Sequence, residues 1–74
     1  MSQKWIIALT DEELGKPAAK RLSLTDLCAR MGFEIRERGR AAITVQGERA
    51  HLAKLRTELA GRADISPYRG LKIL

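Results

Sequence analysis

Three runs of the chain have the residue pattern of β-strands. Residues 4–10 (KWIIALT) are rich in β-branched and aromatic side chains, which predicts a strand buried on at least one face. Residues 33–36 and 43–46 alternate apolar and polar side chains, the period of a strand with one buried and one solvated face. Gly39, between Arg38 and Arg40, supplies a turn. Residues 33–47 therefore predict a half-buried β-hairpin.

A first helix is predicted between the first strand and the hairpin. Its apolar stripe, at i, i+3, i+4 and i+7, consists of Leu24, Leu27, Cys28 and Met31. The pattern fits a helix over residues 17–31, since Pro17 suits a first turn. It also fits a shorter helix that begins at Leu24 and is capped by Ser23 and Asp26. Gly32 stands where a helix C-terminal glycine belongs in both cases.

Residues 48–61 (ERAHLAKLRTELAG) predict a second helix. Its buried stripe is expected to be Leu52, Leu55 and Leu59. We expect Ala53 and Ala60 to back this stripe and Gly61 to end the helix.

Threonine and acidic residues follow the first strand. Thr10 is placed to cap a turn, and Glu13 to reach back toward it, as in a capping box. The acidic cluster formed by Asp11, Glu12 and Glu13 is expected at a helix start or an exposed turn, where acidic side chains suit the helix dipole.

The order of these elements predicts an α+β fold. Apolar residues in the tail (residues 62–74) favour a last strand, which Pro67 and Gly70 confine to an edge or interrupt. Two βαβ units with right-handed crossovers then give the ferredoxin-like βαββαβ arrangement, a four-stranded antiparallel sheet with both helices on one face. We expect one small domain over residues 1–74, with the other sheet face open for docking.

The size and composition of the chain narrow the function classes. A chain of 74 residues builds only a thin core, which disfavours an enzyme with a deep pocket. Cys28 is the only cysteine, so no internal disulfide forms, and its helical spacing makes it a small buried hydrophobe. With His51 as the only histidine, expected at the surface, we predict no metal site and no cofactor. The N-terminal apolar run is too short for a signal peptide or a membrane span, so we expect a cytoplasmic protein.

The net charge of +5 favours anionic partners, which are nucleic acid, an acidic protein or a membrane surface. Arg36, Arg38 and Arg40 make the hairpin basic and could grip phosphates. The charges are mixed along the chain, however, because residues 1–46 carry eight basic and six acidic side chains. No run resembles the aromatic signature with which RNA-binding sheets of this topology stack bases.

The whole-chain pattern resembles the subtilisin propeptide-like proteinase inhibitors. The resemblance is carried by MSQKWIIALT, by a helix ending in MGFEI, by the strand AAITVQ and by ERAHLAKLRTELAGRADI. It implies a module that docks its open sheet face, here the outward residues of 33–38 and 42–46, on a subtilisin-type serine protease. The tail from Tyr68 to Leu74 would then lie in the substrate cleft as an extended strand, with Leu74 nearest the catalytic serine.

The tail departs from the family pattern. Arg69 and Lys72 replace its typically acidic character, and Pro67 and Gly70 interrupt it. These departures leave the predicted fold unchanged and weaken the case for inhibition.

We therefore expect a non-enzymatic protein-binding module, with protease inhibition or propeptide-like chaperone action as its specific form. The predicted partner-binding residues are Arg36, Arg38, Arg40, Tyr68, Arg69, Lys72, Ile73 and Leu74. The alternatives are nucleic-acid binding or regulation through the basic hairpin, and a homodimer that buries the open sheet face. No membrane partner is expected.

Overall fold

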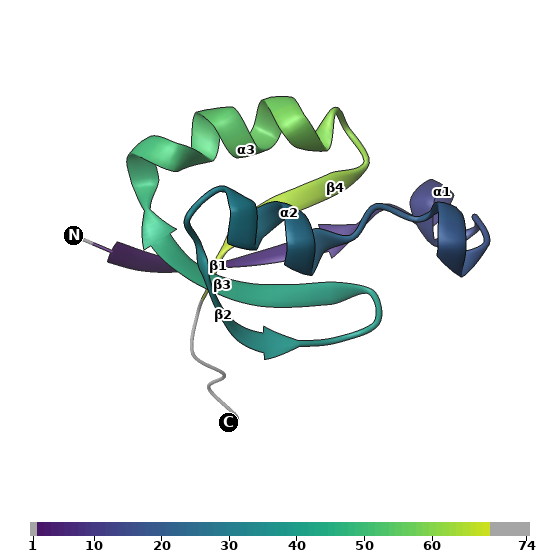
Figure 1. The fold of residues 1–74 in the computed structure, drawn as a ribbon, viewed down its shortest axis with the longest axis horizontal. Coiled ribbons are helices and arrows are strands. Elements are labelled where there is room, and N and C mark those ends of the chain that lie inside the picture. The colour runs from purple at the N-terminus through teal and green to yellow at the C-terminus, as the bar shows by residue number, and fades with distance from the viewer. Residues whose placement is uncertain (1, 69–74) are drawn as a thin grey trace, which may run out of the picture.

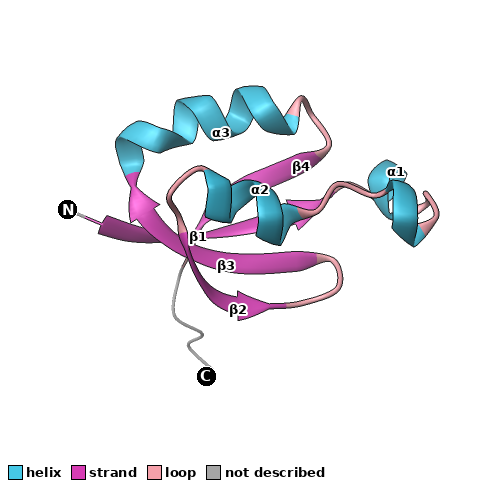
Figure 2. Ribbon diagram, viewed as in Figure 1, coloured by secondary structure: helices cyan, strands magenta, loops and turns pink. Residues whose placement is uncertain are grey.

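The computed structural model describes residues 2–68 and shows the predicted ferredoxin-like topology, with the two main helices on one face of a four-stranded antiparallel sheet (Figures 1 and 2). The strands lie in the order β2-β3-β1-β4. The elements along the chain are β1 (Ser2–Leu9), α1 (Asp11–Leu14), η1 (Ala18–Lys20), α2 (Leu24–Arg30), β2 (Glu34–Arg38), β3 (Ala42–Glu48), η2 (Arg49–His51), α3 (Leu52–Leu59) and β4 (Ala63–Pro67).

The first strand lies in the interior of the sheet. β1 pairs with β3 from Ser2↔Glu48 to Ala8↔Ala42, and with β4 from Trp5↔Pro67 to Leu9↔Ala63. Trp5 and Ile7 point toward the helices and are buried, as the apolar run predicts. The buried core comprises Trp5, Ile7, Leu24, Leu27, Cys28, Phe33, Ile43, Val45, Leu52, Leu55, Leu59 and Ala63.

The shorter of the two first-helix alternatives is correct. Proline at position 17 precedes only the 3-10 turn η1, and α2 begins at Leu24. Ser23 is in the N-cap position, but the expected capping hydrogen bond from its side chain is absent. The helix stops before Gly32, whose φ of +88° is a conformation that glycine adopts without steric cost.

The hairpin forms as predicted, with an irregularity that its alternation does not reveal. Ile35 pairs with Val45 and Glu37 with Thr44, so a β-bulge places Arg36 and Glu37 together opposite one residue. Close contacts require glycine at two positions, one in the turn before β3 and one near the end of β3. A Cβ on Gly39 would lie 2.7 Å from the Ala42 carbonyl oxygen, and one on Gly47 would lie 2.4 Å from the Phe33 ring.

The second helix buries the predicted leucines. Leu52, Leu55 and Leu59 are all in the core, and α3 ends as the chain turns through a left-handed Ala60 and Gly61. The expectation that Ala53 and Ala60 back this stripe is wrong, because both are exposed. Ala60 is the left-handed residue that ends the helix, and Ala53 lies on its solvent side.

The last strand is an edge strand, as the proline in the tail predicts. Among the described residues, β4 pairs only with β1, and no other strand lies on its outer side.

Candidate partner-binding surface

The sheet face opposite the helices is the largest surface that the topology leaves uncovered (Figure 2). The side chains on it follow from the register, since residues adjacent to the buried ones point the other way. We call this surface the open face; it consists of Glu34, Arg36, Glu37, Ala42, Thr44, Gln46, Glu48, Lys4, Ile6, Ala8, Asp64 and Ser66.

The centre of the open face carries short side chains. Ala8 lies opposite Ala42, and Ile6 lies between Thr44 and Ser66. Thr44 is only 8% exposed although no helix covers it, because its neighbours in the sheet surround it. Short side chains at this position let the backbone of a partner approach closely.

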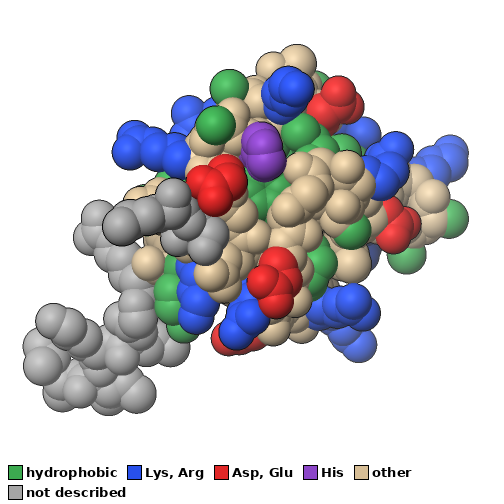
Figure 3. All heavy atoms as spheres, turned by 60° about the vertical axis from the view of Figure 1, so that its left-hand side comes forward, with side chains coloured by type: hydrophobic (Ala, Val, Ile, Leu, Met, Phe, Trp, Pro, Cys, Tyr) green, Lys and Arg blue, Asp and Glu red, His purple; other side chains and the backbone are tan. Residues whose placement is uncertain are grey.

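The open face differs in charge from the chain as a whole. It carries four carboxylates (Glu34, Glu37, Glu48, Asp64) and two cations (Lys4 and Arg36, which is bonded to Glu34), while the chain has a net charge of +5. Among residues 2–68, the excess of basic residues therefore lies on the helix side and at the ends of the sheet. Figure 3 shows Lys and Arg side chains interspersed with Asp and Glu on one side of the molecule, without a single cationic patch.

The structure does not bring the three predicted hairpin arginines together. Arg36 lies in the bulge and donates to Glu34 over 2.9 Å, so its charge is neutralised locally. Arg38 is paired with the inward-facing Ile43 and thus starts on the helix side of the sheet. Arg40 lies in the turn, where it lines a hollow with Leu9 and Arg21. Within residues 2–68 neither Arg38 nor Arg40 has an ion-pair partner.

Tyr68 connects β4 to the predicted tail. Its N–H donates to the Lys4 carbonyl over 3.1 Å, and the Lys4 ammonium lies 5.5 Å from the centre of its ring. Tyr68 is 38% exposed and is the only large exposed hydrophobic side chain in the described part of the chain. The other predicted tail residues, Arg69, Lys72, Ile73 and Leu74, lie outside the described residues.

No aromatic side chain of the described strands lies on the open face, and Tyr68, beside Lys4 at its margin, is the only exposed Phe, Trp or Tyr of residues 2–68. Trp5 and Phe33 are 8% and 4% exposed and belong to the core under the helices. The His51 ring is exposed and meets Phe33 edge-on at 6.2 Å. The means by which RNA-binding sheets of this topology stack bases is therefore missing from the described strands.

The acidic cluster lies at a helix start, one of the two predicted settings, because Asp11, Glu12 and Glu13 form the first turn of α1, but one of its carboxylates is buried. Thr10 does cap α1, since its hydroxyl accepts from the Glu13 N–H over 3.2 Å. Glu13 does not reach back to Thr10; it turns inward, is 2% exposed and accepts from Arg62 at 2.7 and 3.0 Å. The Leu22 N–H and the Lys16 ammonium complete its surroundings at 2.7 and 2.9 Å.

The cluster around Glu13 is structural. The guanidinium of Arg62, then Lys16 and the Leu22 N–H, hold the pKa of Glu13 far below its ordinary value. Arg62 in turn has a raised pKa because it donates to Glu13. An acid that stays ionised in this way is no proton donor for catalysis at neutral pH. Arg62 and Glu13 are 49 residues apart in the sequence, so no local pattern could have revealed this pair.

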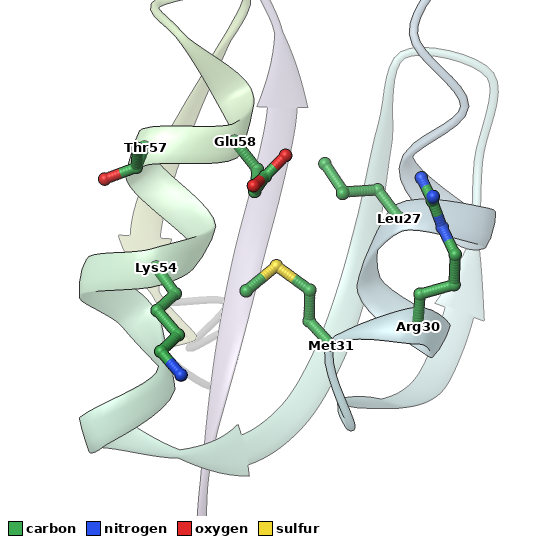
Figure 4. Close-up of a pocket in the computed structure, with 6 residues that line it drawn as sticks. All are labelled: Leu27, Arg30, Met31, Lys54, Thr57 and Glu58. Carbon is green, nitrogen blue, oxygen red and sulfur yellow. The ribbon is translucent and has the colours of Figure 1, made fainter.

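A hollow of about 350 Å³ lies between the two main helices (Figure 4). Leu27 and Met31 from α2 face Lys54 and Glu58 from α3 across it. The side chains at its mouth come from α2 and α3 and include both positive and negative charges. This arrangement offers an apolar floor but no converging set of catalytic groups.

The described residues contain no group of three or more His, Cys, Asp or Glu side chains placed to hold a metal ion. Cys28 is free and fully buried, and burial raises the pKa of its thiol to about 11. The thiol is therefore protonated at neutral pH and does not act as a nucleophile. No helix among residues 2–68 is long and apolar enough to cross a membrane.

Comparison of the chain with protein-family models, curated proteins and solved structures gave no match.

Proposed function

We propose that this chain is a non-enzymatic protein-binding module that docks its open face on a partner protein. The observation that supports this most is a helix-free sheet face with short side chains at its centre, beside a β4 that continues through Tyr68 into the tail. Inhibition of a subtilisin-type protease, or chaperone action of the propeptide kind, is the specific form that we propose. The tail from Tyr68 to Leu74 would then occupy the substrate cleft as an extended strand.

The charges on the open face and on the hairpin turn indicate what kind of partner surface each would contact. The open face carries more carboxylates than cations, so it suits a neutral or basic partner surface. An acidic partner surface would instead meet Arg38 and Arg40 at the hairpin turn.

An inhibition assay tests the specific form. We expect the full chain to slow cleavage of a chromogenic peptide by a subtilisin-type protease, and deletion of residues 69–74 to abolish this effect. Ala8→Arg places a long cation in the centre of the open face and should weaken inhibition at least tenfold. Ala29→Arg is the matched control, because Ala29 is an exposed alanine on α2. Equal inhibition by the Ala8 and Ala29 variants, or none by the full chain, would overturn this form.

Nucleic-acid binding is the second candidate, and the unpaired charges of Arg38 and Arg40 favour it. Phosphate contacts release counterions, so affinity for an oligonucleotide would fall steeply as salt rises. Replacing both arginines with Gln should then remove binding and leave protease inhibition unchanged.

A homodimer formed through the open face is the third candidate. Sedimentation analysis of the wild type and of Ala8→Arg would reveal it, since the variant would be monomeric at concentrations where the wild type is not.

A further inference from the structure

The outer edge of β4 presents backbone groups that no strand uses. The Arg62 carbonyl accepts from the Thr10 N–H, and the Tyr68 N–H donates to the Lys4 carbonyl. Residues at even positions of this strand therefore face β1, and those at odd positions face outward. The N–H and C=O groups of Ala63 and Ile65 thus point away from the sheet, and no described residue bonds them.

A groove runs beside this edge, between β4 and α3, which lie next to each other in Figure 1. It consists of two hollows of about 320 Å³ each, which share Arg56 and Ile65. We call it the edge groove; its lining residues are Trp5, Arg49, Leu52, Ala53, Arg56, Ile65 and Pro67 in one hollow, and Arg56, Leu59, Gly61, Ala63, Asp64 and Ile65 in the other.

The edge groove combines an apolar floor with a cationic rim. Trp5, Leu52 and Ile65 form the floor of the first hollow, and Arg49 and Arg56 are exposed beside it. Neither guanidinium forms an ion pair with any residue of the described range. The Trp5 indole N–H is moreover the one buried side-chain polar atom of residues 2–68 without a hydrogen-bond partner. This region of the fold therefore leaves both charge and hydrogen-bonding capacity unused.

We propose that the edge groove binds an extended acidic peptide segment of a partner protein by strand addition to β4. The added strand would exchange backbone hydrogen bonds with Ala63 and Ile65, place apolar side chains on the floor and set carboxylates against Arg49 and Arg56. Pro67 has no N–H, so pairing extends no further than its carbonyl. The edge groove lies on the helix side of the sheet apart from Asp64, the one residue that it shares with the open face, so this binding does not need the rest of the open face.

The chemistry of the edge favours a peptide over a nucleic acid. Outward donors and acceptors on alternate residues match the repeat of another polypeptide strand. A nucleic acid would use the two arginines but leave the backbone edge and the apolar floor without partners.

Trp5 is the only tryptophan, so it reports on the groove in the unmodified full chain. We would titrate the protein with acetyl-Glu-Thr-Val-Thr-Glu-amide, whose two Glu side chains and one Val side chain share one face of an extended strand, and follow the Trp5 emission and the heat of binding. Saturable binding is expected, and substitution of Gln for both Glu residues in the peptide should weaken it about tenfold. A peptide N-methylated at alternate amides should lose binding if its backbone adds to β4. Equal binding of the N-methylated peptide, or no binding at millimolar concentration, would overturn the proposal.

Substitutions in the protein test the same site independently of changes in the peptide. Arg49→Gln with Arg56→Gln should weaken binding about tenfold, the effect expected of two exposed ion pairs. Lys54→Gln removes one charge from α3 on the side of the hollow in Figure 4 and should leave the affinity within about twofold. Equal weakening by Lys54→Gln, or competition by a random oligonucleotide for the same arginines, would contradict a peptide site. Circular dichroism establishes that each variant is folded.

Discussion

Glu13 shows how a single side chain can link distant parts of this small fold. It belongs to α1, yet its carboxylate accepts from Arg62, which precedes β4, and from the Leu22 N–H ahead of α2. Each of these groups would need another partner if the carboxylate were removed. The hydrogen bonds of Glu13 therefore hold the segment that contains α1 and η1 against the start of β4 and the residues before α2.

We expect Glu13→Gln to lower the melting temperature at pH 7 and to flatten the acid limb of the stability curve. The folded-state pKa of Glu13 is lowered, so its contribution is full above the unfolded-state pKa and is lost as pH falls through the folded one. The wild type should thus begin to lose stability below about pH 5, and the variant less steeply. Urea melts at pH 7 and pH 4 measure this, with the exposed Glu12→Gln as control. Identical pH curves for both variants would exclude the assigned role.

Gly47 is a second position where one residue type is required. Gly47→Ala would drive a methyl group into the Phe33 ring, so we expect a loss of about 1–3 kcal/mol in the free energy of unfolding. Gly15→Ala is the control, because a Cβ there would meet the Glu12 and Asp11 carbonyl oxygens at ordinary distances of 3.5 and 3.6 Å. Denaturant melts that give equal stability for the two variants would contradict the packing described.

At the scale of elements, α3 depends on a stripe of leucines. Leu55 is completely buried, and Leu55→Ala should lower the free energy of unfolding by roughly 2–5 kcal/mol through lost contacts and a residual cavity. The exposed Lys54→Ala on the same helix should change it by less than about 0.5 kcal/mol. Urea melts compare the two, and a loss near zero at Leu55 would refute its core position.

The elements themselves could largely be predicted from local patterns. The period of two in the hairpin and the leucine spacing of α3 each reflect one buried face, and both were confirmed. The alternation around Arg36 could not reveal the bulge, because a bulge adds a residue to one strand only and shows only in the register with its partner. Ala53 and Ala60 were misplaced because alanine suits both a helix core and its solvent side.

The candidate surfaces were less accessible to sequence reasoning than the fold. An open sheet face follows from the order of elements, but its acidic balance depends on which residues share a face. The hairpin arginines are close in the sequence, but the pleat of β2 and the turn after it place their side chains on different sides of the sheet. The edge groove involves β1, α3 and β4, so only the folded chain assembles it.

At the scale of the whole molecule, Cys28 reports on global unfolding. Its thiol is fully buried and its pKa is raised to about 11, so a thiol reagent should modify it only when the core opens. We expect the modification rate at pH 8 to rise with urea in parallel with the unfolding equilibrium. Rapid modification in the absence of urea would mean that α2 opens locally.

The position of β1 inside the sheet has a consequence for the newborn chain. The strand leaves the ribosome first, but one of its neighbours is complete only at Glu48 and the other only at Pro67. At about 5–20 residues per second, translation from Leu9 to Glu48 takes about 2–8 seconds. During that interval the segment SQKWIIAL, with a single charged side chain, has neither of its strands to pair with. We therefore expect nascent-chain chaperones to engage β1 before any other part of this chain.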